Sequence, residues 1–177
     1  MDISNAVRAL TGLWDPAWEG ALMASLTYTA GTGAAQSYRA EVRAAGRRVL
    51  RLTAADGASG ESLSMMLVLP PHKKKENAQT GNAPMQGSFW KRFSAEEISE
   101  AALRVDDHNG IHQGERPVAG GFLLMESIIR EFPGHREYRL RFEAPVYAED
   151  AVYLEPAASG AVATVGGMAV FRADWRD

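Results

Sequence analysis

The first third of the chain consists mainly of short segments in which apolar residues recur at the intervals typical of β-strands. The alternation is clearest where Leu22, Leu26 and Tyr28 are interleaved with Ser25 and Thr27, the two-residue period of a half-buried strand. Turns that contain glycine separate four such segments, which span residues 21–30, 37–45, 48–55 and 62–70. Ahead of them, residues 3–14 predict a short helix that ends near Gly12. The pattern therefore predicts a strand meander without a clear central helix.

The pattern changes after residues 71–87, a polar stretch rich in proline, glycine and asparagine that predicts a linker or long loop. Ser94 and Glu97 then have the spacing of a capping box, and apolar residues follow at helical intervals as far as Val105. A second helix is predicted over residues 121–132, where Pro133-Gly134 ends it. Strands are expected at residues 88–93, 137–146, 151–158 and 161–175.

Composition narrows the class of protein. The 177 residues, 46% of them hydrophobic, suffice for one domain or two very small ones, and a net charge of -3 shows no basic excess for nucleic acid. The absence of cysteine excludes disulfides, thiolate catalysis and cysteine metal sites. The first residues lack the pattern of a secretory signal, and no apolar run approaches the roughly 18 residues that span a bilayer. We therefore expect a soluble, cytoplasmic protein with no nucleic-acid or membrane partner.

Candidate chemistry is concentrated in residues 106–128. The second predicted helix is apolar nearly all round, which indicates burial, yet it contains Glu126. A buried carboxylate is costly unless it is paired or its pKa is raised, so Glu126 has either a functional role or a salt bridge to an arginine such as Arg139 or Arg141. Both interpretations stay open on the residues alone.

The start of that helix is formed by Gly120 and Gly121. Because they lack side chains, a ligand can approach the backbone closely, and the free N–H groups at a helix start attract a developing oxyanion. A plain Gly-Gly turn is the competing interpretation.

The loop before it carries Asp107 and His112, five residues apart, with Asn109 and Gly110 between them. Asparagine side chains bond their own backbone in such turns, so Asn109 is expected to be structural.

Three other chemistries fit this loop poorly. A calcium loop would need acids where Val105 and Arg116 stand. The spacing of His108 and His112 suits zinc only on a helix face, and Asn-Gly opposes a helix here, so no metal is expected. A serine hydrolase is disfavoured because no G-x-S-x-G motif is present and Ser127 lies on the buried helix.

Three segments in order resemble known families and together cover roughly residues 90–155. Residues 93–112 resemble the MaoC-like (R)-specific enoyl-CoA hydratases, whose D-x-N-P-x-H hallmark falls at residues 107–112, with Gly110 in place of the usual proline. Residues 112–126 resemble the beta-hydroxyacyl-acyl-carrier-protein dehydratases, which carry a histidine, then R-P-V, a glycine, and a helical acid fourteen residues after the histidine. Residues 141–150 resemble the R-F-x-x-P-V-x-x-G-D segment of both groups, with Glu149 where glycine is usual.

This resemblance implies the α+β hot-dog fold, an antiparallel sheet wrapped around a long buried helix. Residues 88–177 would form the hot-dog unit with the active-site motif, and residues 1–70 a degenerate hot-dog half, making a double hot dog. We expect the first half to pack against the sheet of the second, with the acyl chain between them. The candidate tunnel walls are Leu22, Leu26, Met65 and Leu67.

The resemblance also implies a hydratase or dehydratase that interconverts trans-2-enoyl and 3-hydroxyacyl thioesters of coenzyme A or acyl carrier protein, without a cofactor. Asp107 and His112 would be the acid–base pair, and Gly121, beside Gly120, would polarise the thioester carbonyl. Glu126 is the alternative carboxylate.

Two other functions stay open on the sequence. A thioesterase on the same fold needs one carboxylate, from Asp107 or Glu126, although the paired His112 argues against it. A non-catalytic acyl-thioester-binding protein stays open because the motif proline is replaced, and because Gly120 stands where the hydratases carry a histidine.

Since twofold dimers are the commonest soluble oligomers, a homodimer is expected.

Overall fold

The computed structural model describes residues 3–35, 37–70 and 87–177. Most of the predicted linker, residues 71–86, lies outside these ranges. Within them the elements are α1 (Ser4–Thr11), a 3₁₀ turn η1 (Pro16–Trp18), β1 (Leu22–Thr29), β2 (Arg39–Gly46), β3 (Val49–Ala55), β4 (Ser62–Val68), β5 (Ser88–Lys91), α2 (Ala95–Arg104), a second 3₁₀ turn η2 (Gly110–His112), α3 (Gly121–Glu131), β6 (Glu137–Phe142), β7 (Val152–Ala157), β8 (Gly160–Val165) and β9 (Met168–Arg176).

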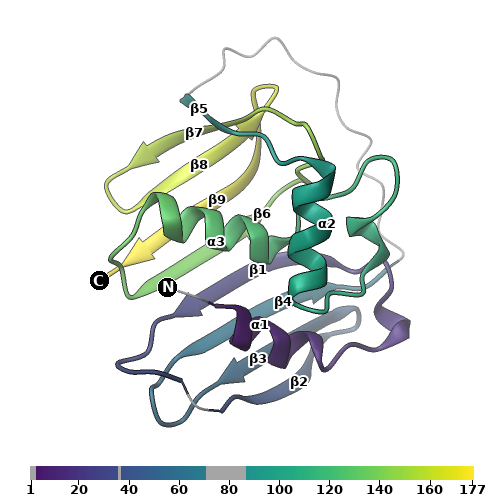
Figure 1. The fold of residues 1–177 in the computed structure, drawn as a ribbon, viewed down its shortest axis with the longest axis vertical. Helices are drawn as coiled ribbons and strands as arrows, with labels where there is room; N and C mark the ends of the chain where they lie inside the picture. The colour runs from purple at the N-terminus through teal and green to yellow at the C-terminus, as the bar shows by residue number, and fades with distance from the viewer. Residues whose placement is uncertain (1–2, 36, 71–86) are drawn as a thin grey trace.

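The strands of the described residues form one antiparallel sheet of nine, in the order β2-β3-β4-β1-β6-β9-β8-β7-β5. The four strands of the first half lie on one side of this order and the five of the second half on the other (Figure 1). They join where β1 pairs with β6, from Ser25 opposite Arg141 to Thr29 opposite Glu137. The sheet therefore continues without a break across the two halves of the chain.

One face of the sheet is apolar and carries the helices. At the junction, Leu26 lies opposite Leu140 and Tyr28 opposite Tyr138, and all four side chains are buried. Residues that alternate with them, such as Arg139 and Arg141, are exposed. The three helices lie over one face of the curved sheet (Figure 1). Burial of this face between helices and strands is the main source of stability in such a layered fold.

The helices α1 and α3 cover different parts of the sheet. The helix α3 packs on the two junction strands β1 and β6, while α1 packs on β2, β3 and β4. Ser94 caps α2 as predicted, with its Oγ accepting the Glu97 N–H at 3.0 Å. The Glu97 carboxylate binds Lys91 Nζ at 2.6 Å. No helix in the described part of the chain is long and apolar enough to cross a membrane.

The prediction of a single strand over residues 161–175 was wrong. The chain turns back between β8 and β9, where Gly166 and Gly167 have φ of 57° and 80°. Positive φ at both central residues is typical of the tight turn of a two-residue hairpin, and glycine adopts it without strain. Apolar residues on both sides of the glycines hid this turn in the sequence.

Candidate active site

The loop that leaves α2 brings Asp107 and His112 together. Asp106 adopts a positive φ of 54°, and the Asp107 N–H bonds back to the Ala102 carbonyl at 2.9 Å, so the chain turns sharply after the helix. Asp107 Oδ1 accepts the Asn109 N–H at 3.1 Å, and its Oδ2 lies 3.3 Å from His112 Nε2. The sequence-predicted acid and base are therefore in direct contact.

His112 is held on both ring nitrogens and is only 6% exposed. Its Nδ1 lies 2.7 Å from the Val118 carbonyl. A carbonyl oxygen only accepts, so Nδ1 is the donor and Nε2, which faces Asp107, is the nitrogen that gains and loses a proton. Burial by itself lowers the pKa of His112, but the hydrogen bond and charge of Asp107, together with the Val118 carbonyl, raise that pKa above its ordinary value of 6.5.

Both glycines at the start of α3 have close neighbours. A Cβ on Gly120 would lie 3.4 Å from His112 Cε1, tight against the imidazole ring. A Cβ on Gly121 would overlap the Met23 sulfur and lie 3.1 Å from Phe142 Cζ. The first turn of a helix has N–H groups without intrahelical acceptors, and the Gly121 N–H is one of them.

Glu126 lies on α3 and its carboxylate binds the guanidinium of Arg104 on α2. The arginines that the sequence suggested for it were wrong, since Arg141 binds Asp174 at 2.8 Å. The Glu126 side chain is 14% exposed, and the guanidinium offsets the cost of its partial burial. In this structure the carboxylate that contacts His112 is that of Asp107, and Glu126 joins α2 to α3.

Asn109 is a buried turn residue, 6% exposed. Its Oδ1 accepts the Ile111 N–H at 3.5 Å, as expected for a side chain that stabilises its own turn. It also bonds the backbone of Gly20 and Ala21 from the first half of the chain, contacts that local sequence could not reveal.

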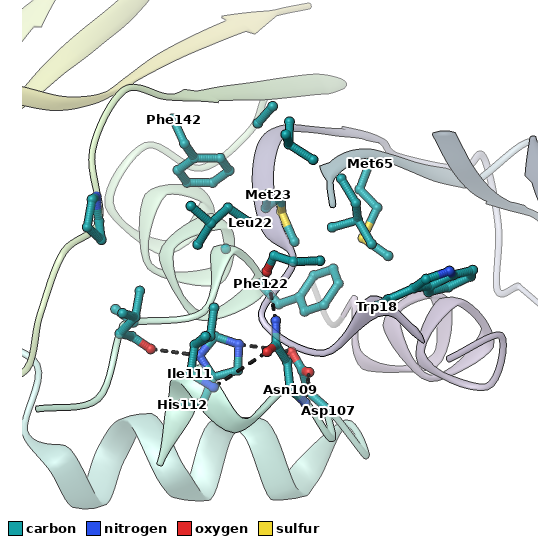
Figure 2. Close-up of a pocket in the computed structure, with 18 of the residues that line it drawn as sticks. Trp18, Leu22, Met23, Met65, Asp107, Asn109, Ile111, His112, Phe122 and Phe142 are labelled. Atoms are coloured by element: carbon teal, nitrogen blue, oxygen red, sulfur yellow. Dashed lines mark hydrogen bonds and ion pairs between the residues drawn. The ribbon is translucent and has the colours of Figure 1, made fainter. Parts of the chain in front are cut away.

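A mostly apolar cavity of about 450 Å³ opens beside the Asp107–His112 pair and reaches into the first half of the chain. Figure 2 shows Asp107, Asn109 and His112 at its wall, with Met23 and Phe122 nearby. Its lining includes Leu22, Met65 and Leu67, which the sequence predicted, and Trp14, Trp18, Met23 and Phe142, which it missed. The fourth predicted wall residue, Leu26, is not among the lining residues and is fully buried in the core.

A bulge in β1 explains why Met23 lines the cavity although the sequence did not predict it. The register shifts between Met23 and Ser25, so Met23 pairs with Leu67 and Leu26 pairs with Met65. Strict alternation would put Met23 on the opposite face from Leu26, but the extra residue brings both to the helix face. Met23 thereby reaches the start of α3.

No protein-family model and no curated protein sequence matches the chain. Solved structures do match. HtdX from Mycobacterium tuberculosis is similar with a TM-score of 0.64 at 18% identity, over 98% of this chain and 84% of that one. A MaoC-like dehydratase from Phytophthora capsici is similar with a TM-score of 0.55 at 14% identity, over 94% and 75% of the two chains.

These likenesses agree with a nine-stranded sheet whose junction strands β1 and β6 pack against α3. The chain has the hot-dog fold. An acyl-ACP thioesterase from Bacteroides thetaiotaomicron is also similar, with a TM-score of 0.48 at 12% identity over 88% of this chain and 75% of that one. Sequence identities this low concern the fold, so the reaction has to be inferred from the side chains of the site.

Proposed function

We propose that this hot-dog protein is an acyl-thioester hydratase or dehydratase. It interconverts trans-2-enoyl and 3-hydroxyacyl groups on coenzyme A or acyl carrier protein and uses no cofactor. The observation that carries this proposal is the contact between Asp107 and buried His112 at the wall of an apolar cavity, beside the first turn of α3. The similar structure from Phytophthora capsici is named a MaoC-like dehydratase, which supports the same class of reaction.

The arrangement suggests how substrate would lie. The acyl chain fits the apolar cavity, and the thioester carbonyl points toward the Gly121 N–H at the positive end of α3. The double bond then faces Asp107 and His112. This placement brings the electrophilic C3 to the acid–base pair and leaves the carrier outside the cavity.

In the hydration reaction one carbon–oxygen bond forms and two protons are transferred. The oxygen of a water attacks C3 while the Asp107–His112 pair accepts a proton from that water. The electrons of the double bond move toward the carbonyl, and the Gly121 N–H stabilises the resulting enolate oxygen. C2 then takes a proton from the pair, so one water is added and the pair returns to its starting state. Dehydration runs through the same steps in reverse.

The pairing of His112 separates this proposal from a thioesterase. Hydrolysis needs water directed at the carbonyl carbon and releases a free thiol, for which one carboxylate suffices. A buried imidazole with a fixed tautomer and an acidic partner suits repeated proton exchange instead.

The test uses purified protein with crotonyl-CoA and with longer trans-2-enoyl thioesters of both carriers. We expect the enoyl-thioester absorbance to fall, without release of free thiol. Thiol release would assign the site to a thioesterase, and binding without turnover would assign it to a non-catalytic acyl-binding protein.

We also propose that the first half of the chain is a degenerate hot-dog half. Strands β1 to β4 with α1 repeat the arrangement of a sheet covered by a helix, but α1 has only 8 residues, against 11 in α3. The shorter helix leaves the space beside β1, β3 and β4 into which the cavity extends.

A further inference from the structure

The segment that leads into β1, residues 15–21, holds the turn between Asp107 and His112 with three hydrogen bonds. The Gly20 N–H donates to Asn109 Oδ1 at 3.2 Å, and Asn109 Nδ2 donates to the Ala21 carbonyl at 2.8 Å. The Gly110 N–H donates to Glu19 Oε1 at 2.9 Å. The two residues at the centre of the turn are therefore anchored to the first half of the chain.

The anchoring segment is itself fixed. Asp15 caps η1 by accepting the Ala17 N–H at 2.8 Å, and the Ala21 N–H bonds to the Trp18 carbonyl at 2.8 Å. Gly20 adopts a positive φ of 74°, a conformation that favours glycine, and this conformation aims the chain into β1. These bonds therefore hold the backbone that carries Glu19 in place beside the turn at Asn109 and Gly110.

Gly110 is the position where the resembled motif carries proline. Asn109 has φ of -69° and ψ of 113°, an extended conformation in the broad region that the residue before a proline favours over the helical one. A proline has no N–H and fixes φ, whereas glycine leaves φ free and adds a donor. A Cβ at position 110 would lie 2.6 Å from Glu19 Oε1, so the carboxylate occupies the space of the missing ring.

We propose that Glu19 is a positioning residue that acts through Gly110 and substitutes for the rigidity of a proline. By accepting the Gly110 N–H, its carboxylate fixes the turn that sets Asp107 against His112. The expected change in turnover rests on the proposed hydratase function. The expected effect on the turn at Gly110 rests on the hydrogen bonds alone.

The kinetic test compares Glu19→Ala, Glu19→Gln and the double variant Glu19→Ala/Gly110→Pro with the wild type. Loss of the acceptor in Glu19→Ala is expected to lower kcat about tenfold with little change in KM, because misplacement of reacting groups costs turnover more than binding. Glu19→Gln keeps an accepting oxygen and should retain kcat within about twofold. The matched control is Glu100→Ala, which removes an exposed carboxylate from α2.

The double variant is the discriminating one. Proline at position 110 needs no acceptor and meets no carboxylate once Glu19 is alanine, so the double variant should regain most of the turnover that Glu19→Ala loses. A role of Glu19 that does not act through Gly110 would not be rescued by the change at position 110. Wild-type turnover in Glu19→Ala, or a double variant no faster than Glu19→Ala, would overturn the proposal.

A second readout does not depend on turnover. In the folded protein, amide hydrogen exchange at Gly110 should be faster in Glu19→Ala than in Glu19→Gln, with Glu19→Met as a variant that keeps the side-chain length but not the acceptor. Unchanged exchange in both Glu19→Ala and Glu19→Met would reject the positioning role, whether or not the protein is a hydratase. Inactivity of the wild type on every enoyl thioester would instead reject the proposed function.

Discussion

At the level of single residues, the proposal depends on the contact between Asp107 and His112. His112→Ala and Asp107→Asn are each expected to lower kcat at least 100-fold, about the contribution of general acid–base catalysis. Glu126→Gln should retain kcat within about threefold, because the Glu126 carboxylate binds Arg104 and not His112. Steady-state kinetics on folded variants, checked by circular dichroism, measure all three. A Glu126→Gln variant as slow as Asp107→Asn would move the carboxylate role to Glu126.

The protonation of His112 gives a second prediction at this scale. Its pKa is raised because the negative charge and hydrogen bond of Asp107 favour the protonated ring more than burial disfavours it. Its titration midpoint by NMR should therefore lie above 6.5 in the wild type and move to lower pH in Asp107→Asn. The resonance is assigned by its loss in His112→Gln. A midpoint that does not move in Asp107→Asn would show that Asp107 does not act on the ring.

At the level of elements, local patterns predicted most of the fold. Alternation, the Ser94 cap and the all-round apolar character of α3 depend on neighbours within a few residues, and the corresponding strands and helices are present. The hairpin at Gly166-Gly167 was missed because apolar residues flank the two glycines on both sides. The bulge in β1 was missed because one extra residue leaves no compositional trace.

The contacts of the candidate site were predictable only in part. Asp107 and His112 are five residues apart, so a single tight loop brings them together, and a motif can record them. The partners of Glu126 and Gly110 come from other elements, Arg104 on α2 and Glu19 before β1, which only the tertiary fold brings close. The same holds for Met23 and Phe142 over Gly121.

The start of α3 gives the prediction at the element scale. Gly121→Ala adds a Cβ that overlaps the Met23 sulfur and presses on Phe142, so these side chains must move toward the proposed thioester position. We expect kcat/KM to fall at least tenfold, although alanine suits a helix. The second variant, Met23→Ala/Gly121→Ala, frees that space and should recover part of the loss. Equal activity of Gly121→Ala and the wild type would mean that substrate does not approach this turn.

At the level of the whole molecule, the cavity is lined by residues of both halves of the chain, and its volume limits the acyl chain of the proposed substrate. Met65 lines it from β4, in the first half of the chain (Figure 2). A tryptophan in its place should fill much of the cavity, so Met65→Trp is expected to lower kcat/KM for long-chain enoyl thioesters at least tenfold while crotonyl-CoA is affected little. Equal losses of kcat/KM for short and long acyl groups would indicate that the acyl group does not lie along Met65.

The continuous sheet makes the halves interdependent. A fragment of residues 87–177 would expose the edge of β6 that pairs with β1, and would leave α3 without half of its support. It would also lose the bonds from Thr11 Oγ1 to the Val105 carbonyl, 2.6 Å, and from Arg8 Nε to the Arg104 carbonyl, 3.2 Å. We expect this fragment to aggregate or to lack activity, as judged by light scattering and the enoyl-thioester assay. A soluble, folded and active fragment would show that the first half is an accessory.

The expected homodimer stays a prediction at this scale. The edge strand β2 is largely exposed and ends the sheet on one side, while β5 ends it on the other. Exposed edges of this kind tend to find partners, and light scattering of the intact protein measures the assembly directly.

The most direct test of the proposed reaction is the fate of water. A trans-2-enoyl-CoA is incubated with the protein in water labelled with oxygen-18, and the products are analysed by mass spectrometry. The account predicts a 3-hydroxyacyl-CoA that still carries coenzyme A and has the label in its hydroxyl group, and no such product with His112→Ala. Label in a free carboxylic acid, or unchanged substrate with the wild type, would contradict it.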